Sequence, residues 1–306
     1  MSTEYIVRDN VLWYAEPYLK SGKQRNMQNS KGGTPMKIAA FYENIYDGAQ
    51  AAGRHMEDVL TELRDAGLEM LYFAFDSLKR DRKQMTGIME KLGLRIEGVH
   101  AFCDFAADPE TDRYMEMIDL AADAGAGNLL IIPGMFTSGN TDRDLERMVA
   151  GVRKTVEYGR KKNMPVLMED YDGLLSPYNC IAGLRYFLES VKGLECAFDT
   201  GNFAVFHEDE LEAFEMFADK IRTVHLKDRS LTRRHEGDTP FVCADGKEAY
   251  ACAIGSGYIR IGEILKRLKQ RGYNGNVIVE LYMCDLRYVL QDAVDSIRWL
   301  KEQLQE

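Results

Sequence analysis

From Met36 onward, short apolar runs alternate regularly with helix-length amphipathic segments, and this alternation is the feature that most constrains the fold. The apolar runs have the length of strands and recur about every 30 residues until the seventh. There are eight such runs, at residues 37–42, 69–74, 95–100, 128–133, 165–170, 194–199, 221–226 and 276–281. Strands that alternate with helices pair in parallel, so eight such units predict a closed (β/α)8 TIM barrel. A doubly wound open sheet is the alternative for the same pattern.

The segments between the apolar runs have the spacing of amphipathic helices. In residues 53–66 one helical face carries Met56, Val59, Leu60 and Leu63. Residues 143–162 and 259–271 behave likewise. Glycines close three of the helical segments, at the positions where a C-terminal cap is expected: Gly67, Gly93 and Gly272.

The first 35 residues differ from the rest of the chain. Residues 21–34 are polar, rich in glycine and without periodicity, which is typical of a linker. The segment before them is more apolar and includes Trp13 and Tyr14. We therefore expect an N-terminal extension and linker at residues 1–35 and a single barrel domain at residues 36–306.

Composition excludes several classes of protein. Net charge is −10, so long-range repulsion disfavours nucleic acid as a partner. The polar start lacks the apolar stretch of a signal peptide, and no run approaches the ~20 residues of a membrane span. None of the six cysteines forms a C-x-x-C pair, and Cys103, Cys196 and Cys252 lie among apolar neighbours, as in a reducing compartment. We expect a cytoplasmic protein that binds neither membrane nor nucleic acid.

Four ionisable residues stand at the ends of consecutive apolar runs: Glu169, Asp199, His225 and Glu280. Active sites of barrels form where several strands end, so these side chains are expected to converge. Three carboxylates cannot lie together without a balancing positive charge. A divalent cation would supply it, and this set of ligands suits Mn²⁺, Mg²⁺, Co²⁺, Fe²⁺ or Zn²⁺. The alternative is that each residue is a separate, hydrogen-bonded polar group at a strand end.

The segments around these residues resemble the xylose isomerase-like TIM-barrel family. That family includes D-tagatose 3-epimerase, hydroxypyruvate isomerase, inosose dehydratase and endonuclease IV. The resemblance covers roughly residues 36–306. Its matching pieces are VLMED with Glu169, FDTGN with Asp199 and Asn202, VHLKD with His225 and Asp228, and the long piece IGSGYIRIGEILKRLKQRGYNGNVIVEL with Glu280.

The resemblance implies a role for each of the four residues. Glu169, Asp199, His225 and Glu280 would hold one divalent metal ion, Mn²⁺ first, and Glu169 and Glu280 would flank the substrate as acid and base. The implied activity is that of a metal-dependent isomerase or epimerase of a keto sugar or polyol, which works through an enediolate. Five further residues are candidates for binding the substrate: His100, Asn202, Lys227, Asp228 and Arg229.

The sequence departs from the family pattern at two of these positions. Asn202 stands where the ketohexose epimerases carry a histidine, and Arg229 is the nearest arginine to one expected at a different spacing. The motif HLKD at residues 225–228 is more similar to the inosose dehydratase and sugar-phosphate isomerase branches of the family. Endonuclease IV needs additional histidines for three zinc ions, and this chain has only five histidines, so that activity is disfavoured.

Other functions remain open on the sequence. The same enolate chemistry would serve a lyase, either an inosose-type dehydratase or a subunit that cleaves a C-glycoside of an oxidised sugar together with a small partner subunit. A sugar-binding barrel without turnover is the non-enzyme alternative, and the presence of both glutamates disfavours it. Assembly into a homo-oligomer is also compatible with the sequence.

Two features should shape the mouth of the barrel. Residues 228–258 form a long connection after the seventh run, which we expect to cover the metal or to dock a partner. The connection carries the basic residues Arg229, Arg233 and Arg234 and a Gly255-Ser256-Gly257 turn, interpreted as an ordinary turn in preference to a phosphate site. Three aromatic residues follow strand ends and could wall a sugar pocket: Phe102, Phe105 and Tyr171.

We predict that the barrel folds without its N-terminal extension, because residues 21–34 read as a linker. A variant that lacks residues 1–35 should keep a single cooperative urea transition, followed by circular dichroism. If the shortened chain is instead insoluble or molten, Trp13 and Tyr14 pack against the barrel or a second copy, and the linker interpretation is wrong.

Overall fold

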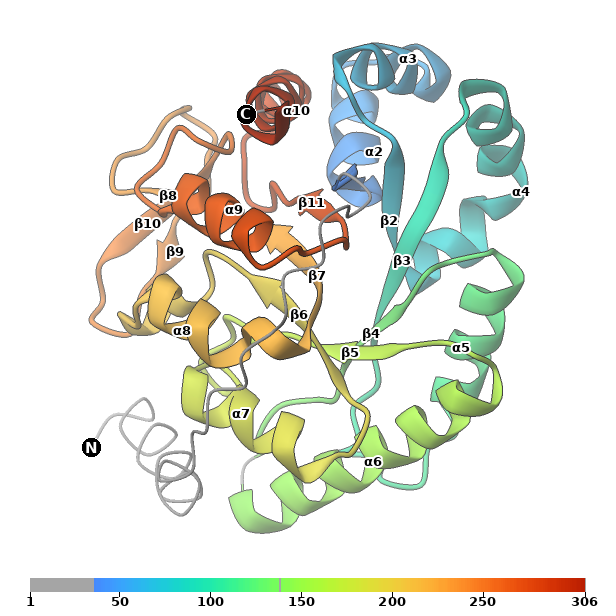
Figure 1. The fold of residues 1–306 in the computed structure, drawn as a ribbon, viewed down its shortest axis with the longest axis vertical. Helices are drawn as coiled ribbons and strands as arrows, with labels where there is room; N and C mark the ends of the chain where they lie inside the picture. The colour runs from blue at the N-terminus through green and yellow to red at the C-terminus, as the bar shows by residue number, and fades with distance from the viewer. Residues whose placement is uncertain (1–35, 138, 306) are drawn as a thin grey trace. The chain divides into compact units, whose positions relative to one another are not determined.

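The structure, a computed structural model, describes residues 36–137 and 139–305, so the predicted extension at residues 1–35 lies outside the described residues. Eight parallel strands hydrogen-bond in the closed order β1-β11-β7-β6-β5-β4-β3-β2 (Figure 1). They are β1 (Ile38–Phe41), β2 (Met70–Ala74), β3 (Arg95–Phe102), β4 (Leu129–Ile132), β5 (Val166–Met168), β6 (Glu195–Asp199), β7 (Ile221–Leu226) and β11 (Val277–Val279). The closed order confirms the predicted TIM barrel and excludes the open sheet.

Contacts group the described residues into two compact units. The first, here the β1 unit, comprises residues 36–97, 199–201 and 223–305. Its helices are α2 (Tyr42–Ala51), α3 (Met56–Ala66), α4 (Phe75–Leu92), α9 (Ile261–Gln270) and α10 (Val289–Gln305). Helix α10 packs on α2, α3 and α9 and also touches β1 and β11. The C-terminal helix therefore covers the strands at which the barrel begins and ends.

The second unit, here the β4 unit, comprises residues 98–198 and 202–222. Its helices are α5 (Arg113–Asp123), α6 (Thr141–Lys161), α7 (Ile181–Ser190) and α8 (Glu210–Phe217), with the 3-10 turns η2 (Phe203–Phe206) and η3 (Ala218–Lys220). Helix α5 packs on β4 and on α6, and α6 packs on β5, as Figure 1 shows. No helix in the described part of the chain is long and apolar enough to cross a membrane.

Phe105 corrects one expectation about the mouth. Its ring is fully buried rather than lining a pocket, and it lies beside Tyr114 of α5 and Gly151 of α6. The backbone N–H of Phe105 donates to the carbonyls of Cys103 and Pro133, so the chain turns back just after β3. Phe105 is therefore a core residue that packs against helices α5 and α6.

The long connection after β7 contains structure that the sequence analysis missed. It forms a three-stranded antiparallel sheet in the order β8-β10-β9, from β8 (Asp228–Ser230), β9 (Phe241–Val242) and β10 (Glu248–Cys252). These strands are two to five residues long, too short for a clear two-residue periodicity. The connection therefore has regular structure of its own, and its expected role at the mouth stays a prediction.

All six cysteines lie in the described residues and are buried, and no disulfide joins them, as expected for residues that fill the core. Burial raises the pKa of Cys103 to about 11 and that of Cys252 to about 11. Both remain neutral thiols at neutral pH, and reactive cysteine chemistry at these positions is disfavoured.

Two helical glycines make a matched pair for testing the packing around Phe105. A Cβ at Gly151 would lie 2.1 Å from the Phe105 ring, whereas a Cβ at Gly87 of α4 would meet nothing within 4 Å. We expect Gly151→Ala to lower the free energy of unfolding by about 1–3 kcal/mol through overpacking. Gly87→Ala should raise it by about 0.5–1 kcal/mol, because alanine is the better helix former. Urea denaturation checks both values, and equal stability of the two variants would contradict this packing.

Candidate metal centre

The four ionisable strand-end residues come together in the structure. Glu169, Asp199, His225 and Glu280 each offer a ligand atom, and these atoms lie within 4.8 Å of one another. Their side chains are at most 8% exposed. Asp199 ends β6, His225 is the penultimate residue of β7, and Glu169 and Glu280 directly follow β5 and β11. This is the carboxyl end of the strands, where barrel enzymes carry their chemistry.

Asp199 is held by the junction between β6 and β7. One of its oxygens accepts the backbone N–H of Gly201 at 2.7 Å, and the other faces Lys227. The hydroxyl of Thr200 bridges to Lys227, since it donates to the Lys227 carbonyl and accepts the Lys227 N–H, both at 3.0 Å. A Cβ at Gly201 would lie 2.5 Å from the Lys227 carbonyl oxygen, so this close approach requires glycine.

His225 is packed between aromatic rings of the β1 unit. Phe41 and Tyr72 lie nearly perpendicular to its imidazole, at centroid distances of 5.1 and 5.0 Å. Its Nδ1 atom lies 3.5 Å from a carboxylate oxygen of Glu280. Because the ring is fully buried, these neighbours fix its orientation and hold it beside Glu280.

Lys227 introduces a positive charge among the carboxylates. Its Nζ atom lies 2.6 Å from one Glu280 oxygen and 3.6 Å from one Asp199 oxygen. Burial alone would raise the pKa of Glu280, but the ammonium group of Lys227 and the imidazole of His225 outweigh it and hold this pKa well below its usual range. Glu280 is therefore a carboxylate at neutral pH. The predicted contact of Lys227 with substrate stays a prediction.

The donor set fits a divalent ion. Three carboxylates supply hard oxygen ligands and His225 supplies one nitrogen, a combination suited to Mn²⁺, Mg²⁺, Fe²⁺, Co²⁺ or Zn²⁺. Their burial would keep bulk water from competing for the ion. The four residues could hold one metal ion, while Lys227 already balances part of their negative charge.

Several supporting residues were not singled out from the sequence. Asn44 of α2 accepts the backbone N–H of Leu281 at 2.9 Å and so fixes the chain immediately after Glu280. Thr200, Phe41 and Tyr72 act on Asp199 and His225 as described above. Asn44, Thr200 and Phe41 share only a position at or beyond a strand end, and Tyr72 lies within β2, so none of them stands out in the sequence.

Asn202 and His100 lie in the β4 unit. The side-chain amide of Asn202 donates to the backbone carbonyl of Asp170 at 2.8 Å, next to Glu169. Asn202 is 1% exposed, so its visible role is to position the segment after β5. His100 is half-buried on β3, two residues before the strand ends, and its predicted contact with substrate remains a prediction.

Asp228 organises the connection after β7. Its carboxylate accepts the backbone N–H groups of Arg229, Gly255, Gly257 and Ile259, at 2.8, 2.9, 2.9 and 3.3 Å. Burial raises the pKa of Asp228 in spite of these donors. The N–H groups of Gly255 and Gly257 are therefore already hydrogen-bonded to Asp228. This favours the interpretation of an ordinary turn over that of a phosphate site.

The basic residues of the connection also stabilise it from within. The Arg229 guanidinium is buried and lies 4.1 Å from the centre of the Phe241 ring. Arg233 lies over the Tyr250 ring, and Arg234 donates to the Ser230 hydroxyl and the Ser256 carbonyl. These contacts favour a structural role for Arg229, like that of Asp228, over the predicted role in binding substrate.

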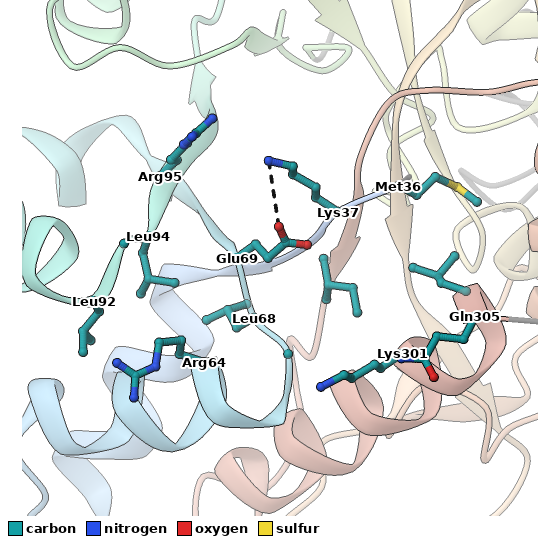
Figure 2. A pocket seen from close by; sticks show the side chains of 14 residues that line it. Met36, Lys37, Arg64, Leu68, Glu69, Leu92, Leu94, Arg95, Lys301 and Gln305 are labelled. Carbon is teal, nitrogen blue, oxygen red and sulfur yellow. Dashed lines mark ion pairs between the residues drawn. The ribbon is translucent and has the colours of Figure 1, made fainter. Parts of the chain in front are cut away.

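A cavity of about 540 Å³ lies at the other end of the β1-unit strands (Figure 2). Its lining includes Lys37 before β1, Glu69 before β2 and Arg95 at the start of β3, and Lys37 pairs with Glu69 at 3.8 Å. Helices α3 and α4 end beside it at Gly67 and Gly93, where basic side chains complement the negative ends of the helix dipoles. In barrels this face serves stability, so the cavity is not the candidate active site.

The chain is similar in sequence to a curated inosose dehydratase of Lacticaseibacillus casei. The two are 24% identical over 143 residues, which make up 46% of this chain and 48% of that enzyme. The match thus spans about half the length of the relative.

Solved structures share the fold at low sequence identity. An L-ribulose 3-epimerase superposes with a TM-score of 0.64 at 18% identity, over 88% of this chain and 95% of the other. The IOLI protein, solved with a bound zinc atom, gives a TM-score of 0.66 at 12% identity, over 88% and 98%. At these identities the likeness shows the fold alone.

The family assignment rests on the longest match. The profile described as "Xylose isomerase-like TIM barrel" covers residues 60–303, most of the chain. The closed eight-stranded barrel agrees with it independently. The chain belongs to the xylose isomerase-like TIM-barrel family.

Proposed function

We propose that this protein is a divalent-metal-dependent isomerase or epimerase of a keto sugar or related polyol. The observation that carries the proposal is the buried group of Glu169, Asp199, His225 and Glu280, with both glutamates present in one cluster. An isomerase or epimerase of this type needs two groups that exchange a proton with carbon, and the two glutamates supply them. Family members include sugar epimerases, which supports an enzyme rather than a binding barrel.

The proposed reaction begins with removal of a proton from the carbon beside the substrate carbonyl. A bound divalent ion would polarise that carbonyl and lower the pKa of the adjacent C–H. One of the two glutamates would accept that proton and the other would return one, since Glu169 and Glu280 lie in the same cluster. Return to the opposite face of the same carbon gives epimerisation, and return to the neighbouring carbon gives isomerisation.

Lys227 has two roles in this scheme. Its ammonium group fixes the Glu280 carboxylate through the 2.6 Å contact. It also places a positive charge where negative charge develops on the substrate oxygens, and such a fixed charge acts strongly in a buried site. Asp199 and His225 would hold the ion and are not needed for proton transfer.

A lyase is the second candidate, and one observation favours it. The curated relative that matches half of this chain is an inosose dehydratase. Loss of a β leaving group from the same enolate would give dehydration, so the two reactions share their first step. The C-glycoside-cleaving subunit with a small partner belongs to this class too. The oligomeric state, a partner subunit and the cytoplasmic location stay predictions from the sequence.

We expect the purified protein to hold about one divalent ion per chain, with Mn²⁺ as the first candidate. Asp199→Ala and His225→Ala should each lower the bound metal at least tenfold, since each removes one of four ligands. Glu97→Gln is the matched control, because Glu97 is a buried acid that accepts from Thr223 of β7 and lies outside the cluster. Elemental analysis after dialysis gives the stoichiometry, and full metal in both ligand variants would refute the centre.

Proton exchange with solvent tests the shared first step. The Mn²⁺-loaded protein is mixed with ketoses and inososes in D2O, the ion is removed by chelation, and deuterium at the carbon beside the carbonyl is followed by NMR. Glu169→Gln and Glu280→Gln should each slow the exchange by about 100-fold or more, as expected for loss of a general acid or base. Retention of metal by the variants shows that the effect is chemical. Unchanged exchange in both variants would remove the glutamates from the mechanism.

A further inference from the structure

Phe102 is exposed where a phenylalanine is normally buried. It is the last residue of β3 and is 49% exposed. Of the other twelve phenylalanines, all described by the structure, eleven are buried, and Phe241 is half-buried under Arg229. Exposing about half of this residue to water gives up part of the free energy that full burial would provide.

The ring of Phe102 is held in place by Tyr171. Their centroids lie 5.8 Å apart at an interplanar angle of 87°, the edge-to-face arrangement that aromatic rings prefer. Tyr171 in turn lies against Gly173 and near Met135, because a Cβ on Gly173 would lie 3.1 Å from its ring and 3.2 Å from the Met135 side chain. The pair is therefore a preformed apolar surface at the ends of β3 and β5.

Exposure increases from the acid–base residue toward this pair. Glu169 is 8% exposed, Tyr171 two residues later is half-buried, and Phe102 beyond it is 49% exposed. The reacting part of a substrate would lie at the buried end of this series. The pair would then meet a part of the substrate that extends from the mouth toward solvent.

The charge around the pair restricts what that part can be. The segments at the ends of β3, β4 and β5, residues 102–104, 133–137 and 169–175, contain no lysine, arginine or histidine. Apart from Glu169 of the metal cluster and the fully buried Asp170, they carry two acids, the exposed Asp104 and the half-buried Asp172. These two carboxylates disfavour a phosphate or carboxylate substituent beside the aromatic pair.

We propose that Phe102 and Tyr171 form a binding platform for an uncharged aromatic or apolar ring attached to the sugar. The substrate class is then a keto sugar or polyol that carries such a ring as a substituent, as a keto glycoside does, rather than a free or phosphorylated sugar. This inference rests on the proposed function, since it takes Glu169 as the residue at the reacting end. Stacking on such a platform contributes about 0.5–1.5 kcal/mol beyond simple burial, equivalent to about 2–12-fold in affinity.

The test compares phenyl and methyl glycosides of glucose, galactose and mannose as binding probes for the Mn²⁺-loaded protein, by isothermal titration calorimetry. The wild-type protein should bind at least one phenyl glycoside about 3–10-fold more tightly than its methyl counterpart. Phe102→Ala and Tyr171→Ala should each reduce that ratio to below about twofold. Phe102→Tyr should preserve it, which separates loss of the ring from a folding defect. Met216→Ala, which removes a side chain 48% exposed on α8, is the matched control and should leave the ratio unchanged.

Three results would overturn the platform. They are no phenyl preference in the wild-type protein for any of the sugars, a preference that survives both alanine variants, and tighter binding of glucose 6-phosphate than of glucose. The outcome of the proton-exchange assay is independent of the outcome of this binding test. Exchange without phenyl preference refutes the platform alone, whereas phenyl preference without exchange on any substrate refutes the proposed chemistry and leaves the platform.

Discussion

Charge balance among buried carboxylates is the constraint on which the rest of the site depends. Asp199 and Glu280 lie with Glu169 in one cluster, and Lys227 reaches two of the three acids. Without positive charge these acids would take up protons or separate. The ammonium group keeps Glu280 ionised, and a divalent ion would complete the neutralisation. The cluster is thus a site that favours cations and that holds one cationic side chain permanently.

The barrel brings these charged groups together because the carboxyl ends of its parallel strands all lie at the same end of the barrel. The β6–β7 junction shows how closely the backbone must approach for this purpose. The Thr200 hydroxyl forms hydrogen bonds with both the backbone N–H and the backbone carbonyl of Lys227. Gly201 has no side chain and so leaves room for that carbonyl. Strand β7 and the residue directly after it therefore place His225 and Lys227 in the site through one set of backbone contacts.

The connection after β7 shows where sequence interpretation reached its limit. Its length and its position after His225 could be recognised, and a function at the mouth was inferred from them. Its short antiparallel sheet could not be recognised, because strands of two to five residues carry too little periodicity. The structural contacts of Asp228 and Arg229 could not be foreseen either, because their partners at Gly255, Gly257 and Phe241 are 12 to 29 residues away.

The sequence by itself determined the eight-strand order of elements and the four strand-end residues of the candidate centre. Periodicity and the placement of a polar residue after an apolar run are local properties, so one strand at a time is enough to see them. Only the tertiary structure decided that Lys227 neutralises Glu280, that Phe105 is core and that Phe102 is exposed beside Tyr171. Those outcomes depend on which distant side chains share a space, and pairing energies and burial arise only when the chain is folded.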